Sequence, residues 1–144
     1  MRDLVVPLVT RYGGALHRVL YRASGGRIGG RVWGLQVVLL TTTGRRSGKR
    51  RTVPLCSIRD GENVAVIGSF GGLDRPPAWS LNLQAEPHAQ LEVGRGRRDV
   101  VARIAAPEER ARLWADVTAK APGYLEYERR TDREIPIVLL QPVP

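Results

Sequence analysis

The sequence has 144 residues, of which 42% are hydrophobic, and a formal net charge of +9. This length suits one domain with a sizeable core, and no apolar run approaches the ~18 residues that a membrane-spanning helix needs. The sequence has one cysteine, Cys56, which excludes an internal disulfide. One cysteine and two histidines are few ligands for a metal ion, so we expect no dedicated metal site. We expect a single cytoplasmic domain, 1–144, in which residues 1–30 form a basic amphipathic helix with a glycine-rich link and residues 31–144 form the core.

The first element in chain order is a helix expected over residues 8–22. Its two faces differ in chemistry: one carries Leu8, Tyr12, Leu16, Val19 and Leu20, and the other carries Arg11, Arg18 and Arg22. Such a helix usually covers a core with its apolar face. A basic amphipathic helix can also lie on an anionic membrane surface, so peripheral membrane contact through residues 8–22 stays open.

A basic loop follows the next apolar run, a strand expected over residues 35–42. Five cations fall within residues 45–51, and residues 1–52 hold 11 Lys and Arg residues against one acid, whereas residues 53–144 hold 12 against 13 acids. Glycines let a backbone approach an anion closely, and arginine forks grip phosphate through two hydrogen bonds. A P-loop is excluded, because three residues separate Gly44 from Gly48 and Arg50 follows Lys49. The loop predicts an anionic ligand; a solvated basic hairpin is the alternative.

The rest of the chain is largely β in pattern. Further strands are expected over 51–59, 63–70, 89–93, 99–104 and 135–141, with a hairpin turn at Asp60–Gly61. Pro77 begins a short helix that ends at about Ala85. Residue 107 begins a helix that buries Leu113, Trp114 and Val117, and residues 122–130 form a second short helix. About six strands without regular βαβ alternation predict a mainly β fold, a small antiparallel barrel with peripheral helices.

Four segments together resemble a known family. They are residues 39–48 with Pro54–Leu55, then 68–72, 77–82 and 127–136. In that order and spacing they resemble the deazaflavin-dependent nitroreductases, the coenzyme F420-dependent quinone reductases, over about residues 25–143. The resemblance implies a split β-barrel of the flavin-reductase type over residues 31–144. It also implies an enzyme that binds coenzyme F420 without covalent attachment and passes a hydride from the reduced deazaflavin to a quinone, nitroaromatic or activated alkene.

The resemblance also implies which residues form the cofactor site. The phosphodiester and polyglutamate tail of F420 would lie along Arg45, Arg46, Ser47 and Arg51, and the ring would be walled by Pro54, Leu55 and Cys56. A strand end and a short helix would complete the site with Ile67, Gly68, Ser69, Phe70, Ala78, Trp79 and Asn82. From residue chemistry alone, Trp79 reads as a core residue, and Ser69 and Asn82 read as ordinary polar residues.

Two tyrosines are the candidate catalytic residues. Tyr124 and Tyr127 stand at i and i+3 and share one helix face. An exposed phenol beside a reduced cofactor can donate a hydrogen bond or a proton to the acceptor. The resemblance implies that Tyr127 lines the substrate pocket; the alternative is that both tyrosines cover one end of the barrel. Ser80 and Cys56 depart from the larger residues of many relatives, so we expect a wider pocket. Because no histidine lies near Cys56 in the sequence, we interpret Cys56 as a packing residue rather than a nucleophile.

Two other functions stay open at this point. The same barrel could bind FMN, although a long basic loop suits a longer polyanion than one terminal phosphate. A non-enzymatic basic module could instead bind nucleic acid or an anionic membrane, but the basic region lacks an aromatic stacking series. We therefore expect a small-molecule hydride acceptor, no nucleic acid partner, and a monomer or homodimer. The sequence does not identify the acceptor.

Overall fold

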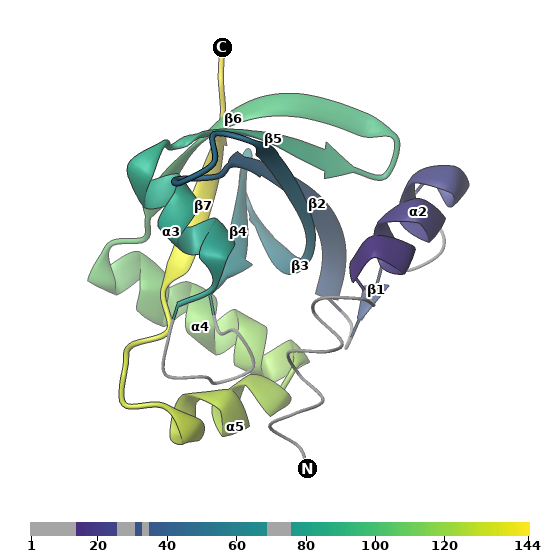
Figure 1. Ribbon diagram of the computed structural model, residues 1–144. Helices are drawn as coiled ribbons and strands as arrows, with labels where there is room; N and C mark the ends of the chain where they lie inside the picture. Colours follow the sequence, from purple (N-terminus) through teal and green to yellow (C-terminus); the bar gives the residue numbers. More distant parts are fainter. Residues whose placement is uncertain (1–13, 26–30, 33–34, 69–75) are drawn as a thin grey trace.

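The computed structural model describes residues 14–25, 31–32, 35–68 and 76–144. Within these ranges the elements follow one another in the order α2 (Gly14–Ser24), β1 (Arg31–Val32), β2 (Leu35–Thr43), β3 (Arg50–Asp60), β4 (Asn63–Ile67), α3 (Ala78–Ala85), β5 (His88–Val93), β6 (Gly96–Ile104), α4 (Pro107–Lys120), α5 (Gly123–Arg130) and β7 (Ile137–Pro142) (Figure 1). In these ranges no helix is both long and apolar enough to span a bilayer.

The strands close into a barrel. Every pairing is antiparallel, and the order along the sheet is β1-β2-β3-β4-β7-β6-β5. Strand β2 also pairs with β5 through Leu39↔Glu92, Leu40↔Leu91 and Thr41↔Gln90, so β2 to β7 form a closed ring. The expected mainly β barrel with peripheral helices is therefore confirmed. Strand β1, which pairs with the start of β2, was not expected, because two residues carry too little pattern to predict a strand.

Local sequence signals explain two of the connections. Asp60 and Asn63 face each other across the β3–β4 turn, and Gly61 adopts φ +62°, a left-handed conformation that glycine accepts at low cost. Helix α4 begins at Pro107, and the Glu109 carboxylate accepts a hydrogen bond of 3.0 Å from the Ala106 amide just before the helix. Acids in a first turn complement the positive end of the helix dipole.

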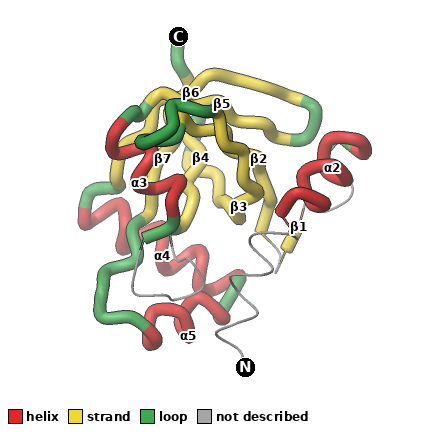
Figure 2. Tube along the Cα trace, viewed as in Figure 1, coloured by secondary structure: helices red, strands yellow, loops and turns green. Residues whose placement is uncertain are grey.

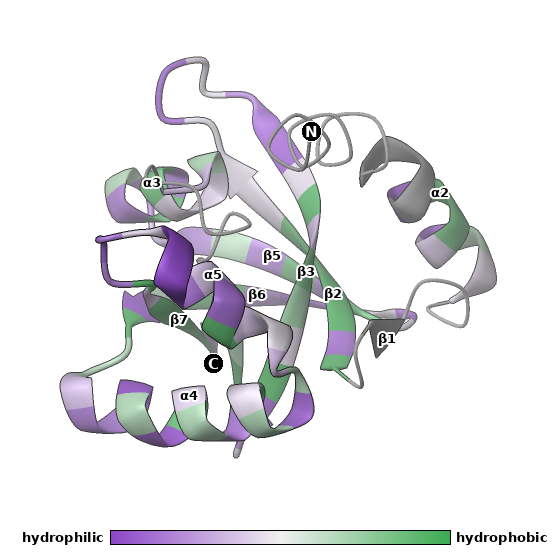
Figure 3. Ribbon diagram, turned by 90° about the horizontal axis from the view of Figure 1, so that it is seen from below, coloured by the Kyte–Doolittle hydropathy of each residue, from purple (hydrophilic) through white to green (hydrophobic). Residues whose placement is uncertain are grey.

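Three apolar clusters hold the fold together, one inside the barrel and two outside it. The interior cluster draws on all six ring strands and on Trp79 and Leu83 of α3. Helices α4 and α5 cover the outer face of β3, β4 and β7, and α2 covers part of the outer face of β2, where Tyr21 packs on Val37 and Leu39. Figure 2 shows these three helices outside the strands, and Figure 3 shows hydrophobic stretches of β2 and β3 between α2 and the pair α4 and α5.

Several expected boundaries need comment. The structure confirms the helix over residues 107–120 with Leu113, Trp114 and Val117 buried. The strand expected over residues 63–70 is described as far as Ile67, and Ser69 and Phe70 lie outside the described residues. The last strand begins at Ile137 rather than residue 135, and Ile135 packs into the outer cluster before the strand starts. Of the helix expected over residues 8–22, the part up to residue 13 also lies outside the described residues.

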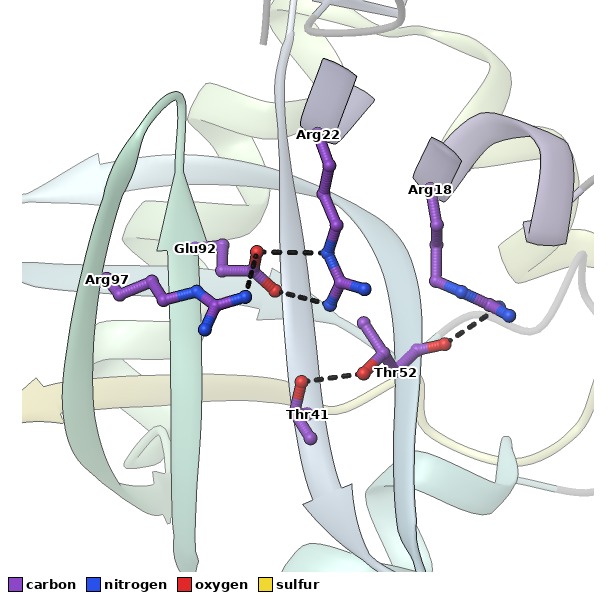
Figure 4. Close-up of polar contacts among 6 residues, drawn as sticks. All are labelled: Arg18, Arg22, Thr41, Thr52, Glu92 and Arg97. Atoms are coloured by element: carbon purple, nitrogen blue, oxygen red, sulfur yellow. Dashed lines mark hydrogen bonds and ion pairs between the residues drawn. The ribbon is translucent and has the colours of Figure 1, made fainter. Parts of the chain in front are cut away.

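Helix α2 meets the barrel with the opposite face from the one expected. Tyr21 is 1% exposed, whereas Val19 and Leu20 are 64% and 39% exposed. The arginine face binds the barrel: Arg18 donates to the Thr52 carbonyl at 3.0 Å, and Arg22 donates two hydrogen bonds to Glu92 (Figure 4). The expectation that apolar Val19 and Leu20 cover the core is therefore wrong. The barrel surface under α2 carries the Glu92 carboxylate and the Thr52 carbonyl. Both are hydrogen-bond acceptors, so they bind the arginine face of the helix.

Candidate functional site

Most of the expected site residues lie at one end of the barrel, which we call the α3 end. Strand β2 ends there and β3 begins there, and the pairings bring the end of β4, the start of β7 and the end of β6 to the same side. Helix α3 covers this end, with Trp79 7% exposed and Leu83 5% exposed against the interior cluster. Trp79 is therefore a core residue of the barrel end, and Ala78 before it is exposed.

The basic hairpin, residues 44–51, projects from the α3 end. Its turn is closed by hydrogen bonds of 2.8 Å from Gly44 N to Lys49 O and from Gly48 N to Gly44 O. The Ser47 hydroxyl accepts from Lys49 N at 3.2 Å, and a Cβ at position 44 would stand 2.6 Å from that hydroxyl, so a larger residue there would displace the Ser47 side chain. Ser47 thus supports the shape of the turn from within it.

The cations of the basic hairpin are available to an anion. Arg45, Arg46, Lys49, Arg50 and Arg51 are all exposed. In the described part of the chain, the acids that form ion pairs do so with arginines elsewhere or, for Glu86, with His88. Five exposed cations on a turn fixed by its own hydrogen bonds make the basic hairpin a candidate anion site.

Asn82 attaches the basic hairpin to α3. This side chain is 5% exposed; its Oδ1 accepts from the Arg45 amide at 3.1 Å, and its Nδ2 donates to the Thr42 hydroxyl at 3.1 Å. Both ends of the carboxamide are therefore engaged inside the protein. Asn82 positions the hairpin, and Thr42, which the sequence did not single out, is its partner on β2.

Strand β3 carries the site from the basic hairpin toward the apolar part. Side chains alternate along a strand, so Arg51, Val53 and Leu55 share one face. Val53 and Leu55 pack against the interior cluster, and Arg51 to Leu55 spans about 13 Å at 3.3 Å per residue. Cys56 faces outward, where it packs against both outer clusters. The structure therefore does not bring the Leu55 and Cys56 side chains to a common face, and Pro54 belongs with Cys56 by the same alternation.

Gly68 is buried at the end of β4 and packs closely against Pro136. Its amide donates to the Pro136 carbonyl at 2.9 Å, and a Cβ at this position would lie 3.0 Å from Pro136 Cγ. Ile67 beside it is buried and joins the outer cluster under α4 and α5.

Within the described ranges there is no group of histidine, cysteine and acidic side chains that could hold a metal ion.

The two candidate tyrosines have different environments. Tyr124 is 6% exposed, and its ring meets Trp114 and Tyr127 edge to face, with centroid distances of 6.2 and 5.6 Å. Its hydroxyl is hydrogen-bonded to the Cys56 thiol, and burial, the largest cause, raises the pKa of both groups. The expectation of an exposed phenol is therefore wrong for Tyr124. The Tyr124 hydroxyl is also a hydrogen-bond partner of Cys56, which the spacing of the two residues in the sequence could not reveal.

Tyr127 remains half-exposed at the edge of the same cluster. Burial raises its pKa above the ordinary value of 10.0, although the Arg130 guanidinium, 5.9 Å from the ring centroid, acts in the opposite direction. The phenol is therefore protonated at neutral pH. It can donate a hydrogen bond to a bound molecule.

The model of the F420H(2)-dependent quinone reductase family matches residues 15–142. An F420H(2)-dependent quinone reductase of Mycobacterium tuberculosis is 40% identical over 129 residues, which are 87% of each chain. A solved F420-H2 dependent reductase is 37% identical with a TM-score of 0.67, over 73% of this chain and 93% of that one. A structure described as a domain-swapped dimer is 32% identical with a TM-score of 0.68, over 88% and 94%. The chain is a split β-barrel protein that belongs to the F420H2-dependent quinone reductase family.

Proposed function

We propose that the protein transfers a hydride from reduced coenzyme F420 to a quinone-type acceptor at the α3 end of the barrel. The observation that carries this proposal is that the exposed basic hairpin and the end of β4 at Gly68 lie at the same end of the barrel. One strand, β3, joins the two places. An elongated ligand with an anionic tail and a flat ring fits such a track, and the family to which the chain belongs is named for dependence on this reduced coenzyme.

Each part of the site has a task under this proposal. The hairpin arginines hold the anionic tail, with Arg51 already on β3, and Asn82 keeps the hairpin in place. Gly68, which packs closely against Pro136, ends the strand against which we infer that the ring edge lies. When bound, the reduced deazaflavin supplies the hydride. Tyr127 holds its proton on the phenol oxygen and donates a hydrogen bond to the acceptor.

Tyr124 has a positioning role under the same proposal. Its buried ring meets Tyr127 edge to face at 90°, and its hydroxyl is held by Cys56. Such a ring restricts the orientation of its neighbour. We therefore infer that Tyr124 acts through Tyr127 rather than on the acceptor.

Anaerobic mixing tests the proposal directly. Purified protein, reduced F420 and 2-methyl-1,4-naphthoquinone should regenerate the absorbance of oxidised F420 faster than the same mixture without protein. Titration with oxidised F420 and with FMN separates the two cofactors, and we expect F420 to bind more tightly. Tighter binding of FMN, or no catalysed oxidation with quinones, nitroaromatics or enones, would contradict the proposal.

A second proposal concerns contact with a membrane surface. Val19 and Leu20 are exposed side by side on α2, while Arg18 and Arg22 are engaged with the barrel. Membrane contact at α2 would therefore rest on the apolar pair rather than on these arginines. Flotation with vesicles containing anionic lipid should decline when Val19 and Leu20 are both changed to Ser. Equal flotation of this variant and the wild type would contradict the proposal.

A further inference from the structure

A pocket of about 260 Å³ lies beside α3, on the flank away from the basic hairpin. Its lining comes from α3, the following turn and the strands β6 and β7: Ser80, Leu83, Gln84, Pro87, Ala102, Arg103, Ile104 and Val138. Successive helix residues are turned by about 100°, so Ser80 and Asn82 project about 200° apart. One flank of α3 therefore fixes the anion site, and the other borders the pocket.

The lining of this pocket mixes apolar and polar side chains and favours an uncharged ligand. Leu83, Ala102 and Val138 belong to or pack against the interior cluster, and Ile104 is 57% exposed at the rim. The Arg103 guanidinium donates to both oxygens of Glu109 at 2.6 and 2.8 Å, so its charge is compensated. The Ser80 hydroxyl, on a residue 3% exposed, and the Gln84 amide are the uncharged polar groups of the lining. An uncharged ligand with polar groups on an apolar frame would suit this lining.

The pocket lies next to the strand end that would meet the cofactor ring. Val138 pairs with Val66 on one side and with Ile104 on the other. Gly68 stands two residues beyond Val66, and such a diagonal neighbour across an antiparallel pair lies about 7–8 Å away. A molecule that reacts with a ring at Gly68 can therefore extend into the pocket.

We propose that the pocket beside Ser80 binds the apolar part of the hydride acceptor that extends beyond its reacting ring, and so determines which acceptor sizes are used. The proposal rests on the proposed function. The acceptor class is an uncharged fused-ring or alkyl-substituted quinone, with one oxygen within reach of the Ser80 hydroxyl. Charged acceptors gain nothing from this pocket.

Two variants that reduce the pocket test the proposal by kinetics. Ser80→Phe fills it from α3, and Ile104→Trp narrows its mouth from an exposed position where folding tolerates a larger side chain. Ala85→Phe adds the same ring to an exposed site on the same helix and serves as the matched control. We expect each pocket variant to lower kcat/KM at least tenfold for 2-methyl-1,4-naphthoquinone and less than threefold for 1,4-benzoquinone. F420 affinity should stay within twofold. An equal effect on both quinones in folded variants would overturn the proposal.

Methyl NMR separates this proposal from the proposed function. Titration of the F420-loaded protein with 2-methyl-1,4-naphthoquinone should shift the methyl resonances of Leu83, Ile104 and Val138, and Ser80→Phe should remove the shifts. These shifts without catalysed F420 oxidation would support the pocket and contradict the proposed reaction. Catalysed oxidation with unshifted methyl groups would support the reaction and overturn the pocket.

Discussion

The guanidinium of Arg22 on α2 donates to both carboxylate oxygens of Glu92 on β5, at 3.1 and 2.8 Å. The Glu92 side chain is 7% exposed, and Arg97 adds a longer contact of 3.4 Å from the other side. The Arg22 hydrogen bond, the largest cause, lowers the pKa of Glu92 below its ordinary value of 4.5 against the opposing effect of burial. An ion pair between an N-terminal helix and a barrel strand thus contributes to folding wherever Glu92 is ionised.

This pair gives a prediction about pH and stability. The pKa of Glu92 is lower in the folded protein than in the unfolded chain. The stabilisation of the folded state by this pair is therefore fully present above pH ~4.5, and it is lost as the pH falls through the pKa of Glu92 in the folded protein. Arg22→Met should lower the free energy of unfolding at pH 7 by about 1–2 kcal/mol, a figure discounted because Arg22 is 44% exposed. The difference from the wild type should shrink as the pH falls below 4.5, as urea titrations at several pH values would measure. Arg112→Met, which removes an exposed pair with Asp60, is the control, and a pH-independent difference for Arg22→Met would contradict the prediction.

The basic hairpin gives a prediction about cofactor affinity. Changing Arg45 and Arg46 together to Ala should weaken F420 binding by roughly 2–5 kcal/mol if they grip the anionic tail in a partly desolvated groove. The melting temperature should change little, because exposed arginines contribute little to folding. Fluorescence titration of F420 measures the affinity. The matched control removes the exposed Arg95 and Arg98 around the other hairpin, and equal losses in the two double variants would indicate a general charge effect rather than a site.

Asn82 should affect cofactor binding without contacting the cofactor. Asn82→Leu keeps the side-chain volume but removes both hydrogen bonds, so we expect a loss of about 1–3 kcal/mol in stability and about tenfold weaker F420 binding. Turnover at saturating cofactor should stay near the wild-type rate, because the hairpin and not the reacting ring is released. Thr42→Val removes one of the two bonds and should give a smaller effect in the same direction. If Asn82→Leu lowered the saturated rate and left the affinity unchanged, the positioning role would be wrong.

The two tyrosines should separate in a pair of phenylalanine variants. Tyr127→Phe should slow turnover roughly 10²-fold and leave F420 affinity nearly intact, because the ring remains and only the proton donor is lost. Tyr124→Phe should lower the free energy of unfolding by about 1 kcal/mol through loss of its bond to Cys56, with a smaller effect on turnover. Steady-state kinetics and thermal unfolding of both variants measure the contrast. The opposite pattern would assign the catalytic phenol to Tyr124.

The sequence predicted local features better than the contacts between distant segments. The Asp60–Gly61 turn and helix α4 follow from neighbouring residues, and both are present as expected. The face of α2 that meets the barrel depends on Glu92, which is 70 positions away, and helical periodicity alone favoured the other face. Tyr124 and Tyr127 share a helix face, but their different burial follows from Trp114 and Cys56 on other elements.

The orientation of α3 also depends on contacts with segments that are distant in the sequence. The sequence placed Asn82 on a short helix, and the structure confirms that helix. Which flank faces the basic hairpin depends on the Thr42 hydroxyl and the Arg45 amide, and no pattern within residues 77–85 carries that information. The role of Asn82 as an internal link therefore needed the three-dimensional contacts.

The closure of the barrel depends on a short seam. Strands β2 and β5 meet over three residue pairs, whereas β2 and β3 meet over eight. Helix α2 crosses this seam: Arg22 binds Glu92 on β5, the Tyr21 hydroxyl accepts from the Gly94 amide at 2.7 Å, and Arg18 binds the Thr52 carbonyl on β3. Helix α2 therefore stabilises the β2–β5 pairing, which is the shortest pairing in the closed ring and the one expected to open first. Amide hydrogen exchange at Gln90 and Glu92 should accelerate in step with release of this helix, which makes opening of the barrel a local event governed from outside the sheet.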